Sequence, residues 1–181
     1  MLRVTFIFAL AVVAIVVVLR LASHHPMPAV GSRAPEFTLP SQEGQPVSLT
    51  QYRGQWIVLY FYPKDQTPGC TREAHNFSVD QSKYAQRNTV VLGISLDNVD
   101  SHKQFCAKEG LRFKLLADTE GKTTHAYGSL TNLGVVKFAA RHTFIIDPAG
   151  KIVKVYDSVD PTKHSAEVLA ALEQLQGVSP S

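Results

Sequence analysis

Two continuous apolar runs most constrain what this chain of 181 residues can fold into. Residues 56–62 read WIVLYFY and residues 90–94 read VVLGI, and neither run alternates with polar residues. Both therefore predict strands that are buried on two faces. Residues 71–87, between them, are polar overall with apolar side chains at helical spacing, which predicts a helix. A strand, a helix and a strand in this order predict a parallel crossover in an α/β fold.

Turn and cap signals predict the remaining elements. A capping box at Ser101 predicts the start of a helix that ends at Gly110. Asp160 as N-cap with Pro161 at the first position predicts a last amphipathic helix, which ends at Gly177. Turns also predict two hairpins, made of residues 37–39 with 47–49 and of residues 142–147 with 152–156. Together these elements predict an α/β sheet with helices on both faces.

Residues 4–19 form an uncharged, almost wholly apolar run between Arg3 and Arg20. As a helix this run spans about 24 Å, so it crosses a hydrocarbon core of about 30 Å only if the arginines snorkel outward. Its length also fits the core of a secretory signal, but no convincing small-x-small cleavage site follows. We expect residues 1–22 to be an uncleaved anchor, with a cleaved export signal and a buried helix of the domain as the alternatives.

The proline- and glycine-containing residues 23–33 predict a tether, which leads to one domain over residues 34–177. The 18 basic and 15 acidic residues of the full chain are scattered, and no block of like charge could follow a phosphate backbone, which argues against nucleic acid as a partner. The two cysteines, Cys70 and Cys106, are too few for a disulfide-stapled fold or a four-cysteine zinc site. They suffice for a redox pair.

Cys70 follows the loop of residues 63–69, where a buried strand has ended and a helix is about to begin. Unpaired N–H groups and the positive end of the helix dipole favour the thiolate there, and only the thiolate is a competent nucleophile. Thr67 offers a hydroxyl one turn before the sulfur. Arg141 directly precedes a predicted strand, and a permanent cation beside the thiolate would stabilise it. The alternatives are an inert core cysteine and a solvated arginine.

The segment FYPKDQTPGCTREA, residues 61–74, resembles the peroxiredoxins, and specifically the bacterioferritin comigratory protein or peroxiredoxin Q branch. Pro63, Thr67 and Cys70 match the motif P-x-x-x-T-x-x-C. The resemblance covers residues 30–175. It also includes the segments GSRAPEF, SHKQFC and RHTFIID, which begin at residues 31, 101 and 141.

This resemblance implies a thioredoxin-like fold, in which helices flank a central mixed β-sheet. Cys70 would be the peroxidatic cysteine, Thr67 and Arg141 would position the peroxide, and Pro63 would shield the sulfur. The implied activity is reduction of hydrogen peroxide and organic hydroperoxides in antioxidant defence, with a thioredoxin-like dithiol protein as reductant. No metal, haem or flavin is implied, and we expect a monomer.

Two features depart from the commonest pattern of that branch. Many members carry a resolving cysteine five residues after the peroxidatic one, but that position here is His75. Other members place it on the next helix, where Cys106 stands. The apolar N-terminus is the second departure, and it leads us to expect a membrane-anchored or exported domain that faces the periplasm or another extracytoplasmic side.

Helix geometry gives a second argument about Cys106 as the resolving cysteine. Cys70, Ala74 and Phe77 share one predicted apolar helix face, whereas Cys106 follows Phe105 near the edge of another. Two cysteines so placed are unsuited to the Cα separation of about 4.4 to 6.8 Å that a disulfide needs. We therefore expect the first turn after Cys70 to unwind when the disulfide forms. Alternatively, Cys106 is a core residue and an outside thiol resolves Cys70.

Three other functions compete with a peroxidase. A membrane-tethered thiol-disulfide oxidoreductase needs C-x-x-C, but Thr67 stands three residues before Cys70. A non-catalytic thioredoxin-fold module would lack peroxide turnover. A metal site would need the cysteines and some of the seven histidines, which share no ligand spacing. Peroxide consumption and metal analysis distinguish these readings.

Overall fold

The structure is a computed structural model that describes residues 25–177. The predicted anchor of residues 1–22 and the first two residues of the predicted tether lie outside the described residues. Within residues 25–177, no helix has the length and apolar character needed to span a bilayer.

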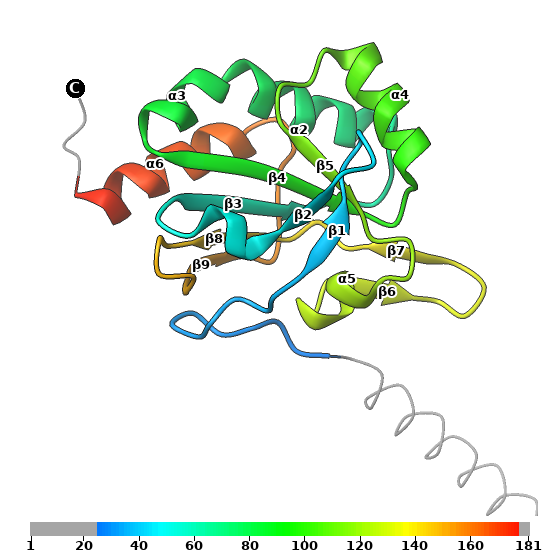
Figure 1. The fold of residues 1–181 in the computed structure, drawn as a ribbon, viewed down its shortest axis with the longest axis horizontal. Helices are drawn as coiled ribbons and strands as arrows, with labels where there is room; N and C mark the ends of the chain where they lie inside the picture. The colour runs from blue at the N-terminus through cyan, green and yellow to red at the C-terminus, as the bar shows by residue number, and fades with distance from the viewer. Residues whose placement is uncertain (1–24, 178–181) are drawn as a thin grey trace, which may run out of the picture.

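A five-stranded mixed sheet forms the centre of the fold, with strand order β5-β4-β3-β8-β9 (Figure 1). Its strands are β3 (Trp56–Phe61), β4 (Thr89–Ser95), β5 (Lys114–Ala117), β8 (Thr143–Ile146) and β9 (Ile152–Tyr156). β3 runs parallel to β4, and β4 runs parallel to β5. β8 is antiparallel to both β3 and β9. The predicted crossover and the predicted C-terminal hairpin are both confirmed.

The central strand β3 divides the core into two layers because its side chains alternate between the faces of the sheet. Tyr60 and Tyr62 pack on one face, and Leu59 and Phe61 on the other. The helices on the first face are α2 (Pro68–Val79), α3 (Gln81–Gln86), α4 (Val99–Glu109) and α6 (His164–Gln176).

The opposite face also carries a helix, as predicted, but only a short one. This face is covered mainly by the hairpin of β1 (Thr38–Pro40) and β2 (Pro46–Ser48) and by the 3-10 turn η1 (Leu49–Tyr52). The short helix α5 (Lys122–Ala126) and the hairpin of β6 (Leu130–Asn132) and β7 (Lys137–Ala139) complete this layer. Apolar residues of the N-terminal hairpin region, such as Phe37 and Val47, already bury this face, so no long helix is needed there.

Three predicted helix bounds were wrong. The helix predicted over residues 71–87 is interrupted at Asp80, which ends α2, begins α3 and accepts a hydrogen bond from Ser165 of α6 at 2.7 Å. α4 starts earlier, because Asn98 rather than Ser101 is the N-cap. α6 starts later than Pro161, because Asp160 caps a separate turn by accepting from the Thr162 N–H.

Candidate active site

Cys70 is the third residue of α2, in the turn where backbone N–H groups have no helical partner. Thr67 is the N-cap and Pro68 occupies the first helical position, which suits a residue without an N–H. The side chain of Cys70 is almost completely buried, at 1% exposure, and shares a core cluster with Ala74 and Phe77. The predicted position and helix face are therefore confirmed.

Arg141 reaches this turn from the segment just before β8. Its Nη2 atom donates a hydrogen bond to Cys70 Sγ at 3.3 Å, across 71 residues of sequence. The structure thus brings together two residues that the sequence analysis singled out separately. A guanidinium that donates to sulfur stabilises negative charge on that sulfur.

Glu73 is a site residue that the sequence analysis missed. It lies three residues after Cys70, on the same side of α2, and its carboxylate forms an ion pair with Arg141 Nη1. Burial raises the pKa of Glu73 to about 7, while the Arg141 charge pulls that pKa down. Glu73 therefore binds Nη1 of the Arg141 guanidinium, while Nη2 of the same group faces the Cys70 sulfur. The i, i+3 spacing from Cys70 was the available signal.

Thr67 and Pro63 lie in the loop between β3 and α2. The Thr67 hydroxyl donates to the Lys64 carbonyl oxygen at 3.0 Å, so its hydrogen is committed and its oxygen can only accept from a substrate. Pro63 is half-buried and lines a groove of about 450 Å³ together with Leu96 and Phe138. Cys70 does not line this groove, so the predicted shielding of the sulfur by Pro63 stays a prediction.

Cys106 is half-buried on α4, at the edge of the core cluster that contains Cys70, as the helix geometry predicted. Both cysteines are free thiols. Burial raises the pKa of Cys106 to about 12, and the negative charges of Asp65 and Glu43 add to this shift. Cys106 is therefore protonated at neutral pH, whereas Cys70 has a cation beside its sulfur.

The buried cysteine and its arginine sit on a chain whose residues 30–155 match the AhpC/TSA family. The chain belongs to that family. Similar AhpC/TSA proteins include peroxiredoxin Bcp of Bacillus subtilis, 38% identical over 81% of this chain and 96% of that protein. Another is the chloroplastic peroxiredoxin Q of Sedum lineare, 40% identical over 81% of this chain and 78% of that protein.

Solved AhpC/TSA structures show the same fold. A PrxQ mutant from Xylella fastidiosa superposes with a TM-score of 0.78 and 33% identity, covering 83% of this chain and 99% of that one. The peroxidoxin BcpB of Mycobacterium tuberculosis superposes with a TM-score of 0.77 and 30% identity, covering 86% of this chain and 100% of that one. The expected thioredoxin-like fold and the Bcp or peroxiredoxin Q branch are thus confirmed, and the chain is a peroxidase of the peroxiredoxin type.

Within residues 25–177, the structure contains no group of three or more side chains arranged to hold a metal ion. The reactive and polar groups of the site are the Cys70 sulfur, the Arg141 guanidinium and the Thr67 hydroxyl.

Proposed function

We propose that this peroxiredoxin reduces hydrogen peroxide and organic hydroperoxides at Cys70, and that Cys106 resolves the oxidised sulfur. The observation that carries the proposal is the contact between Arg141 Nη2 and Cys70 Sγ at the start of α2. It supplies positive charge at the atom that must become a nucleophile, in a position where free N–H groups also favour an anion.

In the first step the Cys70 thiolate attacks the terminal oxygen of the hydroperoxide. An S–O bond forms and the O–O bond breaks, so Cys70 is oxidised by two electrons to the sulfenic acid while the peroxide is reduced. The departing hydroxide or alkoxide takes a proton from water. Arg141 stabilises the negative charge that moves from sulfur to oxygen. The Thr67 oxygen accepts a hydrogen bond from the O–H group of the incoming peroxide.

In the second step the Cys106 thiol attacks Cys70 Sγ. The S–S bond forms, the S–O bond breaks, and the hydroxyl leaves with the Cys106 proton as water. An external thioredoxin-like dithiol then reduces the disulfide and becomes a disulfide itself. We place this cycle within a single chain that acts as a monomer in antioxidant defence.

Paired cysteine variants test the proposal. Cys70→Ser should abolish peroxide consumption, because it removes the nucleophile. Cys106→Ser should react once with peroxide, stall as the sulfenic acid and overoxidise, because no second sulfur condenses with Cys70. Peroxide turnover with a dithiol protein as reductant, and mass spectrometry of the thiols, measure both effects.

Residual turnover above about 1% in Cys70→Ser would contradict the assignment of the nucleophile. Full turnover by Cys106→Ser would instead show that an outside thiol resolves Cys70. The rival thiol-disulfide oxidoreductase gains no support, because Thr67 occupies the position of the first cysteine in its C-x-x-C motif.

We further propose that residues 4–19 hold the domain at a membrane, on its extracytoplasmic side. The support is the uncharged apolar run between Arg3 and Arg20. The reductant would then be a dithiol protein exposed on that same side.

A further inference from the structure

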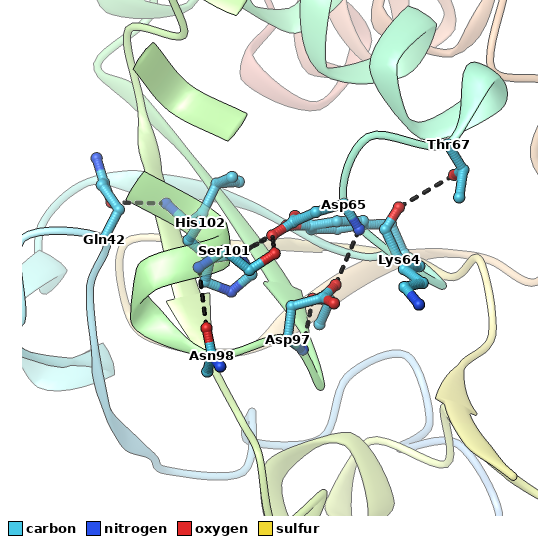
Figure 2. A network of polar contacts seen from close by, with 11 residues as sticks. Gln42, Lys64, Asp65, Thr67, Asp97, Asn98, Ser101 and His102 are labelled. Atoms are coloured by element: carbon cyan, nitrogen blue, oxygen red, sulfur yellow. Dashed lines mark hydrogen bonds and ion pairs between the residues drawn. The ribbon is translucent and has the colours of Figure 1, made fainter. Parts of the chain in front are cut away.

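A buried polar network connects the loop before Cys70 to the helix that carries Cys106 (Figure 2). Its centre is Asp65, whose side chain is 2% exposed. One carboxylate oxygen accepts from Ser101 Oγ at 2.7 Å and from His102 Nδ1 at 2.8 Å. The other accepts from the Tyr62 hydroxyl at 2.7 Å, which fixes the carboxylate against the end of β3.

The backbone of Asp65 is held as firmly as its side chain. Its N–H donates to Asp97 Oδ2 at 2.8 Å, and Ser95 Oγ donates to the same oxygen at 2.8 Å. Burial pushes the pKa of Asp65 up, but the hydrogen bonds from His102, Tyr62 and Ser101 outweigh burial and leave the pKa lowered. The carboxylate is thus ionised at neutral pH, and hydrogen bonds to an ionised acceptor are the stronger kind.

The two ends of this network lie close in sequence to the two cysteines. Asp65 precedes Cys70 by five residues, which span at most about 17 Å when extended. His102 precedes Cys106 by four residues, which rise about 6 Å along α4. If the start of α2 unwinds, a chain held at Asp65 therefore keeps Cys70 within reach of Cys106.

Apart from packing in the core, the covalent path between the two cysteines runs through residues 71–105. The network replaces that long path with a short one across the loop and the first turn of α4. A short connection raises the effective concentration of one group at another.

We propose that Asp65, Ser101 and His102, here called the Asp65 clamp, are positioning residues for disulfide formation. The clamp holds the loop that precedes Cys70 to the first turn of α4, so that the unwound start of α2 delivers the sulfenic acid to Cys106. This inference rests on the proposed role of Cys106 as the resolving cysteine.

The test separates the two chemical steps in the full chain. After one equivalent of hydrogen peroxide, rapid thiol blocking and mass spectrometry give the rates of sulfenic acid and of disulfide formation. His102→Gln and Ser101→Ala should leave the first rate within about twofold of the parent and slow the second about tenfold. Overoxidation of Cys70 should then set in at correspondingly lower peroxide.

Two further readouts distinguish positioning from a general structural role. The disulfide of the clamp variants should be easier to reduce in a glutathione redox buffer, because a tenfold loss of effective concentration raises the midpoint potential by about 30 mV. Ser101→Thr, which keeps the hydroxyl, should restore the rate of disulfide formation. Lys103→Gln, at an exposed neighbouring position on α4, is the matched control and should behave as the parent.

Parental disulfide rates in Ser101→Ala and His102→Gln would overturn the inference, whatever happened to their stability. So would an equal slowing of both steps, which would place the effect at the Cys70 site. If His102→Gln failed to fold, the pair Ser101→Ala and Ser101→Thr would decide, because it changes one hydrogen bond. A parent that forms no Cys70–Cys106 disulfide would defeat the proposed role of Cys106 as well, so the two failures are distinguishable.

Discussion

Arg141 presents two nitrogens of one guanidinium to two groups on α2, the Cys70 sulfur and the Glu73 carboxylate. The carboxylate fixes the orientation of the guanidinium plane, and the second nitrogen is thereby aimed at the sulfur. Thr67 contributes a different specificity, because its oxygen can accept but has no hydrogen to donate. In the proposed reaction, the Thr67 oxygen would accept a hydrogen bond from the O–H group of the hydroperoxide.

Removing either group should slow the first step. Arg141→Ala and Thr67→Val should each lower the rate of Cys70 oxidation by roughly 10²-fold or more, because both groups act on the transition state. Stopped-flow reaction with hydrogen peroxide measures this rate. Arg53→Ala, which breaks the ion pair with Glu36 and a hydrogen bond to the Ala149 carbonyl but touches no residue of α2, serves as the arginine control. An unchanged rate in Arg141→Ala would leave Arg141 a structural role only.

Glu73 should give stability a pH dependence. Its pKa is raised from 4.5 to about 7 in the folded chain, so the folded state binds this proton more tightly than the unfolded state. The contribution of Glu73 to the free energy of unfolding is then greatest below about pH 4.5 and declines as pH rises toward 7. Glu73→Gln should remove this decline, which amounts to about 3 kcal/mol.

Urea unfolding of parent and Glu73→Gln between pH 4.5 and 8 checks this expectation. Glu120→Gln, at an exposed carboxylate, is the control. Parallel stability curves for the parent and Glu73→Gln would show that Glu73 keeps an ordinary affinity for its proton.

At the residue scale, the sequence predicted the position of Cys70 and its burial, since both follow from local helix spacing. It named Arg141 only by position and by resemblance, because 71 residues separate that arginine from the cysteine. The roles of Glu73 and Asp65 were missed. Their partners lie on other elements, and local spacing does not reveal a partner that the tertiary fold supplies.

At the scale of elements, α2 is the segment that carries the proposed nucleophile. Cys70 is buried in its first turn, and Cys106 lies on a separate helix with a half-buried, protonated thiol. A disulfide requires a Cα separation of about 4.4 to 6.8 Å, and because the two free cysteines sit on separate helices we expect the backbone to move when it forms. The N–H groups at the start of α2 have no helical partners, which makes the first turn the least costly place for that movement.

We therefore expect hydrogen exchange of residues 67–77 to be faster in the oxidised than in the reduced protein. The region of β3 and β4 should be unchanged, because these strands are mostly buried and pair with each other over residues 56–61 and 89–94. Mass spectrometry of exchanged peptides measures the difference, with oxidised Cys106→Ser as a control that cannot form the disulfide. Equal exchange in both states would rule out unwinding of α2.

Helices and strands with strong local sequence signals were predictable, and those with weak signals were not. The long apolar runs gave β3 and β4, and the left-handed Gly110 and Gly177 gave two helix ends. The break at Asp80 was not predictable, since it depends on Ser165 of α6. β5, β6 and β7 were missed, because three or four residues carry too little periodicity to be recognised.

At the scale of the whole molecule, we expect the domain to lie outside the cytoplasm on an uncleaved N-terminal anchor. Intact mass of the mature protein measures retention, and loss of roughly the first two dozen residues would indicate a cleaved signal. A reporter fused after Ser181 shows on which side of the membrane the C-terminus of the chain lies. Reporter activity confined to the cytoplasm would contradict the proposed location.

The two layers of the fold separate the cysteines from the segment that leads toward the N-terminus. The cysteines and α2 lie on one face of the sheet. His25 stacks on His125 at 4.8 Å on the α5 side, where a Cβ on Gly128 would stand 2.6 Å from the Met27 nitrogen. The sheet therefore lies between the cysteines and the segment that leads toward the N-terminus, and we expect unwinding of α2 to leave the packing around His25 and Met27 unchanged.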